Sequence, residues 1–555
     1  MSTFNELIDF TRSTTGTYLD SVVYGDESLT GSWTTVTGFD NITSGTGTNV
    51  TTTSTSSGAS RCYLQINNVE QGKQYKLTVT ISQSNVSSLS VYLRDGASPN
   101  SGTLVAGQSG MQQGNTYTIM GVAESNLMGV LFIGTAASFT ANVSVKEVIG
   151  GQVSGTPLLR TAAINEPRLE YDASGNPLGL LIEEGRTNVL LHSEDFTNAN
   201  WGKTNLTATA NAATAPDGTQ TADKLQLNST TAGVYMVQDN STSSSGYKTV
   251  TVYAKDNNAG YVILRVGDQP SSADRYLVLV DLSNGNVVDT AISSNPSNVS
   301  HTVTPVGNNW YRISVTANLN ESSIRVAITP YCVSSITHTN GTPENAGGAV
   351  GNSVYIWGAQ LEQGAFPTSY IPTSGSTVTR AKDLASVPVE RFAYHTAQSS
   401  FVVQASTINT NNVQAAIYAG KSSTNRILIY RTGNNKKLNF QVISGGVNVA
   451  QLNQNFGEKF AARYKLNDMN SAVNGVSGTV DTTSPLMTLD PSAIYIGSYD
   501  SSTNHWGGHI KSVQYYPKGL SDTELQLLTQ PSASPTMNLT FDGQATSTLV
   551  EGFHD

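Results

Sequence analysis

Three polar segments of the sequence carry residue types that bind sugars. Residues 197–203 hold a tryptophan, residues 267–276 hold two aspartates and a tyrosine, and residues 499–506 end in a histidine and a tryptophan. Aromatic rings offer flat apolar faces to sugar C–H groups, and polar side chains hydrogen-bond the hydroxyls. Each segment could instead be a solvated loop, and Trp201 could plug a core. The candidate carbohydrate-binding residues are Trp201, Asp268, Asp274, Tyr276, Asp500, His505 and Trp506.

Residues 505–509 contain two histidines that could bind a metal ion. His505 and His509 are four residues apart, but Gly507 and Gly508 between them disfavour the helix that would place both on one face. Asp500 and Asn504 could offer oxygen ligands to calcium, although no EF-hand pattern surrounds them. We therefore assign no metal and no cofactor.

Catalysis of glycan hydrolysis would require two carboxylates on the walls of one cleft. Glu183 and Glu184 are neighbours, so in an extended segment they point to opposite sides, and ion pairs with Arg168 or Arg186 are the expected use. No nucleophile elbow, phosphate loop or nucleotide fingerprint is present. We expect no enzymatic activity, with a polysaccharide depolymerase as the alternative, because glycosidase carboxylates have no fixed sequence spacing.

The elements that would position these residues are predicted to be strands. Apolar residues alternate with polar ones in runs such as 75–81, 248–254 and 426–431, which recur at intervals of about 8–15 residues. This spacing favours antiparallel sandwiches over βαβ units. Trp310 and Trp357 lie in such runs and are expected in the core. One helix is predicted over residues 520–529, where Ser521 and Glu524 form a capping box.

Composition excludes several classes of protein. Charged residues make up 13% of the 555, about half the ordinary share, so a charge-rich disordered chain and a coiled coil are excluded. The net charge of −10 argues against a nucleic-acid partner. No apolar run of about 18 residues is present, so no membrane span is expected. The N-terminal residues lack the pattern of a secretory signal. A disulfide between Cys62 and Cys332 is not expected.

The chain is predicted to be all-β, with tandem antiparallel β-sandwiches joined by short linking segments. Two sandwiches are interpreted as jelly rolls, because both end in an alternating strand that closes with a glutamate. The expected units are residues 1–25 plus 150–191 as a discontinuous N-terminal linking unit, 26–149 as an inserted jelly roll, 192–371 as a second jelly roll, 372–396 as a linker, 397–529 as a third sandwich, and 530–555 as a C-terminal tail.

Several motifs over residues 157–383 resemble a family of bacteriophage tail and fibre proteins. The sequence reads EPR at 166–168, GLLIEEGRTN at 179–188 and SEDF at 193–196. The further matches are APDGT at 215–219, YIWGAQLE at 355–362, TSYIP at 368–372 and VTRAKD at 378–383. The resemblance implies a jelly roll similar to carbohydrate-binding modules over residues 192–371.

A second resemblance concerns two motifs that are far apart in this sequence. In that family FTRSTTGTY and LLRTAA-x-NEPR form one continuous stretch, whereas here they occupy residues 10–18 and 158–168. The separation implies that the first jelly roll is inserted into a surface hairpin, where chains tolerate insertions.

Residues 397–529 resemble a concanavalin A-like, laminin-G-type lectin sandwich, through WGGHIKSVQYY at 506–516 and LSDTEL at 520–525.

The leading functional hypothesis is a phage virion protein, a tail fibre or spike-type appendage, that binds host-surface glycans. The resemblance implies other tail or capsid proteins as partners, assembly in the host cytoplasm, display on the particle exterior and a homotrimer, whose multivalency would strengthen weak sugar binding. The alternatives are a structural adaptor or decoration protein without recognition, the depolymerase, and a bacterial surface lectin.

Overall fold

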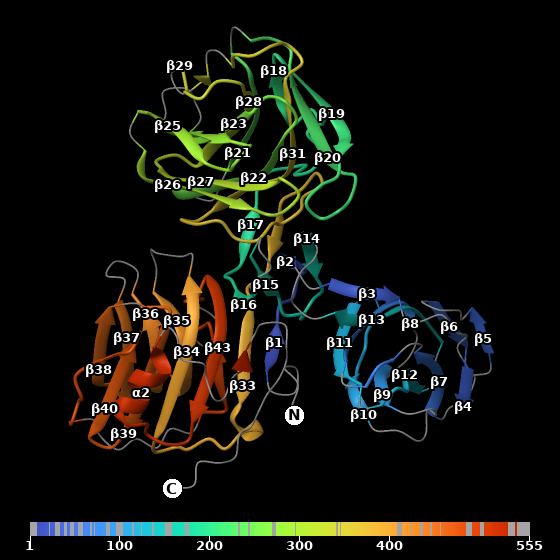
Figure 1. Cartoon of the computed structure of the whole chain (residues 1–555), viewed down its shortest axis with the longest axis vertical. Coiled ribbons are helices and arrows are strands. Elements are labelled where there is room, and N and C mark those ends of the chain that lie inside the picture. The colour runs from blue at the N-terminus through green and yellow to red at the C-terminus, as the bar shows by residue number, and fades with distance from the viewer. Residues whose placement is uncertain are drawn as a thin grey trace.

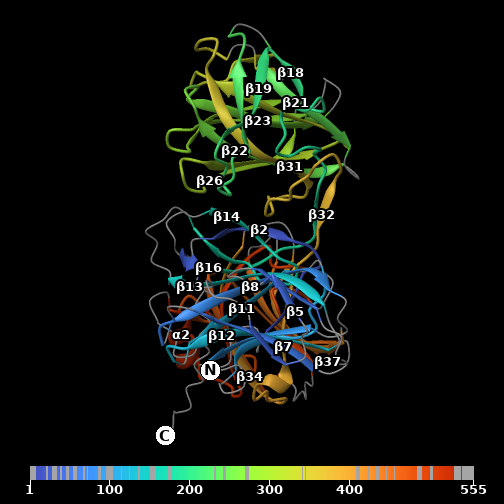
Figure 2. The same ribbon diagram turned by 90° about the vertical axis from the view of Figure 1, so that its right-hand side faces the viewer.

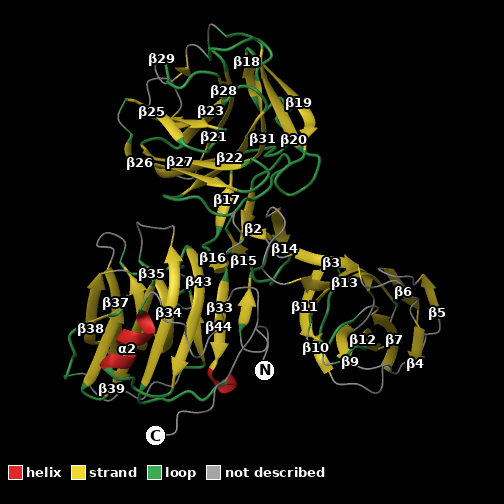
Figure 3. Cartoon of the chain, viewed as in Figure 1, coloured by secondary structure: helices red, strands yellow, loops and turns green. Residues whose placement is uncertain are grey.

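The computed structural model describes most of the chain, and the statements below concern those residues. They are 8–20, 23–27, 34–37, 41–44, 49–53, 59–66, 69–71, 73–84, 89–95, 104–113, 116–123, 125–135, 138–149, 158–172, 177–230, 233–241, 245–268, 274–294, 296–339, 342–343, 346–407, 413–422, 424–432, 437–444, 447–455, 457–483, 491–499, 504–530 and 539–540. The chain folds into three antiparallel β-sandwiches (Figure 1), and strands dominate each of them (Figure 3).

Sandwich one is built from two sheets. The first has the order β10-β9-β12-β7-β4, with β10 (Leu104–Gln108), β9 (Leu89–Asp95), β12 (Met128–Thr135), β7 (Ala59–Ile66) and β4 (Thr34–Thr37). The second has the order β11-β8-β13-β6-β5, with β11 (Thr116–Val122), β8 (Gln74–Ser84), β13 (Phe139–Ile149), β6 (Asn49–Thr53) and β5 (Asn41–Ser44), while β3 (Val23–Glu27) also pairs with β13. Alternate residues such as Val79 and Val130 fill the core between the sheets.

Sandwich two follows the same plan. One sheet has the order β18-β21-β28-β23-β24-β25, with β18 (Gly202–Thr204), β21 (Tyr235–Ser241), β28 (Ser323–Tyr331), β23 (Tyr261–Asp268), β24 (Arg275–Asp281) and β25 (Val287–Ser293). The other has the order β19-β20-β31-β22-β27-β26, with β19 (Leu206–Ala213), β20 (Ala222–Leu227), β31 (Ser353–Gln363), β22 (Gly246–Asp256), β27 (Tyr311–Leu319) and β26 (Ser297–Pro305). The core residues Val252, Leu264 and Val315 come from both sheets. A short hairpin, β29 (His338–Thr339) and β30 (Thr342–Pro343), follows β28.

Sandwich three collects strands from both ends of the chain. Its first sheet has the order β1-β33-β42-β35-β36-β37-β38, with β1 (Asp9–Thr11), β33 (Leu384–Pro388), β42 (Ala493–Ile496), β35 (Gln414–Ser422), β36 (Asn425–Arg431), β37 (Lys437–Ser444) and β38 (Val447–Asn455). Its second has the order β15-β16-β43-β34-β39-β40-β41, with β15 (Leu169–Tyr171), β16 (Pro177–Ile182), β43 (Gly508–Tyr516), β34 (Ser399–Thr407), β39 (Lys459–Lys465), β40 (Asp468–Val473) and β41 (Val476–Ser477), and β44 (Leu539–Thr540) pairs with β43.

The expected helix is confirmed as α2 (Asp522–Thr529), with Ser521 as N-cap and the predicted capping box with Glu524. Its apolar face covers the outer side of the second sheet through Leu525, which packs with Val402 and Ala461. A 3-10 turn, η1 (Val389–Arg391), follows β33. No helix in the described part of the chain has the length and hydropathy needed to cross a membrane.

The linking unit and the linker expected from sequence are distributed differently in the structure. β1, β15 and β16 complete the two sheets of sandwich three instead of forming a separate unit. β33, expected in a linker, is an inner strand between β1 and β42. The physical reason is that these short apolar segments, such as the run Leu180–Ile182, gain most by extending a core that already exists. The Cα register of β16 against β43 makes this extension continuous.

Two short ribbons join the sandwiches. β2 (Gly16–Asp20) pairs with β14 (Leu158–Ala162), and residues 21–157, which contain sandwich one, run between them. β17 (Arg186–Asn188) pairs with β32 (Val378–Arg380), and residues 189–377, which contain sandwich two, run between those. Figure 1 places sandwich two above the other sandwiches with β17 in between, and the perpendicular view in Figure 2 shows β32 in the same position. Sandwiches one and two are therefore both carried on antiparallel ribbons.

Candidate functional site

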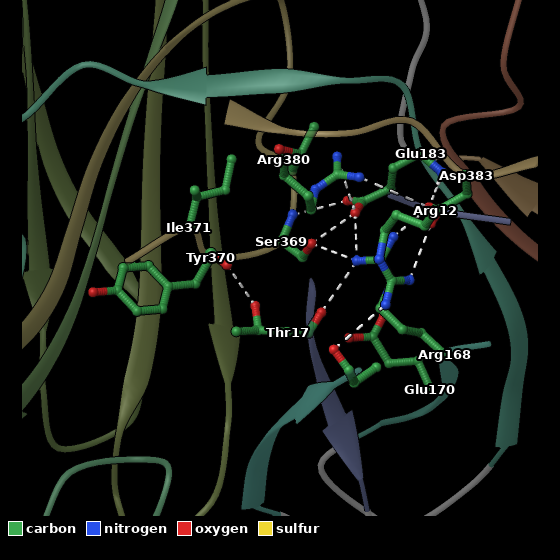
Figure 4. A network of polar contacts seen from close by, with 12 residues as sticks. Arg12, Thr17, Arg168, Glu170, Glu183, Ser369, Tyr370, Ile371, Arg380 and Asp383 are labelled. Carbon is green, nitrogen blue, oxygen red and sulfur yellow. Dashed lines mark hydrogen bonds and ion pairs between the residues drawn. The ribbon is translucent and has the colours of Figure 1, made fainter. Parts of the chain in front are cut away.

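A buried site made of charged side chains lies where the two ribbons meet sandwich three (Figure 4). Five charged side chains meet there, and each residue has at most 1% of its surface exposed. We call this set the ion cluster: Arg12, Arg168, Glu183, Arg380 and Asp383. They come from parts of the chain that are up to 371 residues apart.

The ends of strands position the members of the ion cluster. Glu183 directly follows β16 in one sheet of sandwich three, and Asp383 directly precedes β33 in the other. The backbone N–H of Glu183 donates to Asp383 Oδ2 at 2.9 Å, and the N–H of Asp383 donates to the carbonyl of Glu183. The two carboxylates are thus held side by side at the end of the sandwich.

Arg168 bridges the two carboxylates. Its Nη1 lies 2.7 Å from Glu183 Oε2, and its Nη2 pairs with Asp383 Oδ2. Arg12 reaches the other oxygen of Asp383 at 3.2 Å, and Arg380 lies 3.4 Å from Glu183 Oε2. The ion pair expected between Glu183 and Arg168 is confirmed. Glu184 pairs with Arg186, on the opposite side of the segment, as alternation requires.

Sandwich two is tied to the ion cluster by the segment after β31. The N–H and hydroxyl of Ser369 donate to the two oxygens of Glu183 at 2.8 and 2.7 Å. Thr17 on β2 donates its hydroxyl to the carbonyl of Tyr370 at 2.8 Å, and its own carbonyl accepts from Arg168 Nη1 at 3.1 Å. One network therefore contacts sandwich three, the β2–β14 ribbon and sandwich two.

The electrostatics of the ion cluster favour an ionised Glu183. Burial alone would raise the pKa of Glu183, but Arg380, Arg168 and the Ser369 hydroxyl outweigh it and hold this pKa below its ordinary value. Burial and the neighbouring Arg168 lower the pKa of Arg12. A glycosidase acid needs a raised pKa to remain protonated, and Glu183 has the opposite shift. The cluster is arranged to hold protein segments together.

The two tryptophans proposed from sequence as sugar platforms are core residues. Trp201 is 1% exposed, its ring lies 5.1 Å from that of Phe196, and its Nε1 donates to the carbonyl of His192. Trp506 is fully buried, and its Nε1 donates to the carbonyl of Ser406 at 2.7 Å. For Trp201 the alternative of a core position holds, and neither ring is exposed, because each indole pairs its N–H internally and fills a core. Trp310 and Trp357 are buried, as predicted.

The described polar candidates are divided between sandwiches two and three. Asp268 and Asp274 are both buried at one end of sandwich two, where Asn320 donates to Asp274 at 2.7 Å. The Tyr276 hydroxyl lies 2.6 Å from Nδ1 of His301. His505 is buried in sandwich three. Asp500 lies outside the described residues. Carbohydrate binding by these residues stays a prediction, and among the described candidates Asp268 and Asp274 lie together, joined by a backbone hydrogen bond of 2.9 Å.

Of the two histidines considered for metal binding, His509 is paired with a glutamate. His509 Nε2 lies 2.6 Å from Glu170 Oε2, across the pairing of β43 with the β15–β16 hairpin. Within the described ranges, no group of three histidine, cysteine, aspartate or glutamate side chains lies close enough to hold a metal ion.

An aromatic surface that the sequence analysis missed lies on the first sheet of sandwich three. Tyr418 is cross-strand from Tyr495, and its ring is 6.0 Å from that of Tyr495 and 4.9 Å from that of Tyr499. Tyr430 belongs to the same cluster, and the guanidinium of Arg426 lies 4.6 Å from the Tyr499 ring centre. We call these four tyrosines with Arg426 the tyrosine face.

The tyrosine face points away from the core of sandwich three. Ile417, Ile429, Ile494 and Ile496 fill the core, whereas Tyr418, Tyr430 and Tyr495 occupy alternate positions of the same strands and Tyr499 follows β42. Tyr418 is buried beneath the others, whereas Tyr430, Tyr495 and Tyr499 are half-buried. Alternation within each strand signals outward tyrosines, but their assembly depends on strand register, which no local pattern provides.

Comparisons with known proteins give fold likeness only. No protein family model and no curated protein matches the chain. Among solved structures, the chain is similar to the N-terminal CBM22-1–CBM22-2 tandem domain of Paenibacillus barcinonensis Xyn10C, at 12% identity and a TM-score of 0.19, covering 61% of this chain and 98% of that one. It is also similar to domains LG4-5 of the mouse laminin α1 chain, at 13% identity and a TM-score of 0.19, covering 57% of this chain and 90% of that one.

A third similar structure is the LG1-3 region of the laminin α2 chain, at 8% identity and a TM-score of 0.15, covering 84% of this chain and 98% of that one. The sheets themselves define the class of this protein. It is an all-β chain of tandem antiparallel sandwiches.

Proposed function

We propose that this chain is a non-enzymatic bacteriophage virion protein, of the tail fibre or spike type, that binds host-surface glycans. It would assemble in the host cytoplasm as a homotrimer, attach to other tail or capsid proteins and face the particle exterior. The motifs at residues 166–168, 179–188, 368–372 and 378–383 support the proposal, because they are the stretches that resemble phage appendage proteins.

The tyrosine face is the observation that carries glycan binding. Three half-buried rings lie on an outward sheet face, and Arg426 beside them can donate hydrogen bonds to sugar hydroxyls. Burial raises the pKa of Tyr430, so its hydroxyl is protonated at neutral pH and can donate as well as accept. Flat rings bordered by donors complement the apolar and polar surfaces of a sugar.

A glycan array and an adsorption assay on candidate host cells test the proposal. The purified protein is compared with the double variant Tyr495→Ala/Tyr499→Ala and with Tyr92→Ala, which removes a half-buried tyrosine from sandwich one. We expect the double variant to bind sugar at least about tenfold more weakly, and Tyr92→Ala to bind normally. Equal binding by all three proteins would refute the tyrosine face as the site.

A structural adaptor is the second candidate, and the ion cluster favours it. A buried network that joins sandwich three to sandwich two and to the β2–β14 ribbon serves any protein that must hold a defined shape. The same double variant separates the two functions. Particles that assemble normally but fail to adsorb indicate recognition, whereas normal adsorption leaves the adaptor role.

A further inference from the structure

Three arginines lie on adjacent strands of sandwich two, on the face of the sheet that points away from Leu264 and Val266. Gly267 on β23 is directly opposite Arg275 on β24 and Arg325 on β28. Directly opposed residues share one face of a sheet, and so do residues two apart on a strand, so Arg265 lies on this face too. We call Arg265, Arg275 and Arg325 the arginine face.

Gly267 makes this arrangement possible. A Cβ at that position would lie 2.6 Å from Cγ of Arg275, so the side chain of Arg275 passes directly over the glycine. Arg265 and Arg275 are 4% and 5% exposed, whereas the Arg325 side chain is 30% exposed. Arg265 and Arg275 are therefore buried, whereas the side chain of Arg325 is partly accessible to solvent.

The charges of the arginine face repel one another. Burial, followed by the neighbouring Arg275 and Arg325, lowers the pKa of Arg265 to about 9. Asp239 on β21 is directly opposite Arg325, and its carboxylate also acts on Arg265, as does the Tyr235 hydroxyl on the same strand. Three guanidinium groups are therefore gathered on one sheet face of a chain whose net charge is −10.

Asp239 shows how an anion would be held. Its Oδ1 and Oδ2 accept from Nε and Nη2 of Arg325, both at 2.6 Å, in the two-point geometry that guanidinium groups form with carboxylates and phosphates. The Asp239 side chain is 40% exposed and sits at the rim of the face. Arg265 and Arg275 have further interactions within the chain, so their contribution is charge, and Arg325 makes the contact.

We propose that the arginine face is a second binding site of this protein and that it takes the carboxylate or phosphate group of an acidic glycan. The anion binds Arg325 in place of Asp239, and Arg265 and Arg275 strengthen its attraction from beneath. The assignment deepens the proposed glycan-binding function and rests on it. The presence of three arginines on one sheet face favours an anion as the ligand.

Calorimetric titration of the full-length protein tests the site with three polymers: polygalacturonate for carboxylates, phosphorylated dextran for phosphates, and neutral dextran. The variants are Arg325→Gln, Asp239→Asn and Lys255→Gln, which removes the same charge on β22 in the opposite sheet. We expect Arg325→Gln to weaken anion binding about tenfold or more. Asp239→Asn should strengthen it several-fold, because the internal competitor is gone, and Lys255→Gln should match the wild type.

Binding of either acidic polymer in this variant pattern supports the site and identifies the preferred anion. Weaker binding by Asp239→Asn, or an equal effect of Lys255→Gln, would overturn it, because the arginines would then serve only the fold or the overall charge. Circular dichroism and thermal unfolding of Arg325→Gln check that it folds. Neutral-sugar binding that depends on Tyr495 and Tyr499 would remain if the arginine face fails, so the two proposals can fail separately.

Discussion

Arg168 and Asp383 are 215 residues apart in sequence, yet they form a fully buried ion pair. Arg168 follows the β2–β14 ribbon that carries sandwich one, and Asp383 follows the β17–β32 ribbon that carries sandwich two. Their contact holds the ends of both ribbons against the edge of sandwich three. The charged residues of the phage-like motifs therefore act as a joint between sandwiches.

Removing the charge of Asp383 should destabilise this joint. Asp383→Asn keeps the shape of the side chain but leaves three buried guanidinium groups with Glu183 as their carboxylate in the cluster, a loss of about 3–5 kcal/mol. Calorimetry should show a lower apparent Tm for the transition of sandwich three. Glu390→Gln, an exposed change in η1 beyond the other end of β33, serves as control, and equal Tm values for both variants would contradict the role of the ion cluster.

Acid should loosen the same joint. The pKa of Glu183 is lower in the folded protein than in the unfolded chain, where it is about 4.3. Its contribution to stability is therefore complete above that pH and is lost as the pH falls further toward its folded value. Tm measured against pH should decline in this range. Glu183→Gln should have a lower Tm at neutral pH and a flatter decline, and an unchanged slope would refute the assignment.

Trp201 should act on stability and not on sugar binding. Trp201→Ala removes a fully buried ring, which costs about 3–5 kcal/mol, whereas Trp201→Phe should cost less because it leaves a smaller cavity. Chemical unfolding measures the difference, and a glycan array compares the variants with the wild type. A Trp201→Ala protein of normal stability that has lost sugar binding would restore Trp201 as a platform.

Gly179 should be required for the pairing of β16 with β43. Its φ is +111°, and an added Cβ would lie 2.5 Å from the carbonyl oxygen of Ile510. Gly351 has a similar φ of +100° with open space around it, so Gly351→Ala measures the backbone strain alone, about 1–2 kcal/mol. Gly179→Ala should lower the Tm further than Gly351→Ala, and an equal loss would mean that the strands can move apart.

Much of the secondary structure could be predicted from local sequence patterns. Alternation over residues such as 248–254 and 426–431 predicted strands that the structure contains as β22 and β36, and Ser521 with Glu524 predicted the start of α2. An extended segment with Glu183 and Glu184 also predicts ion pairs with Arg168 or Arg186, and the structure pairs Glu183 with Arg168 and Glu184 with Arg186. These features depend on interactions within one strand, one helix end or one hairpin, where the order of side chains has a direct effect.

Tertiary structure decided where these pieces meet. Nothing local places β1 and β33 beside each other in a sheet of sandwich three, brings Asp383 to Arg168, or aligns Tyr418 with Tyr495. The same alternation that predicts a strand leaves its neighbours unspecified, so Trp201 could be read as core or rim until its partners were known. Register between distant strands comes from burying the whole apolar surface at once, and that is a property of the folded chain.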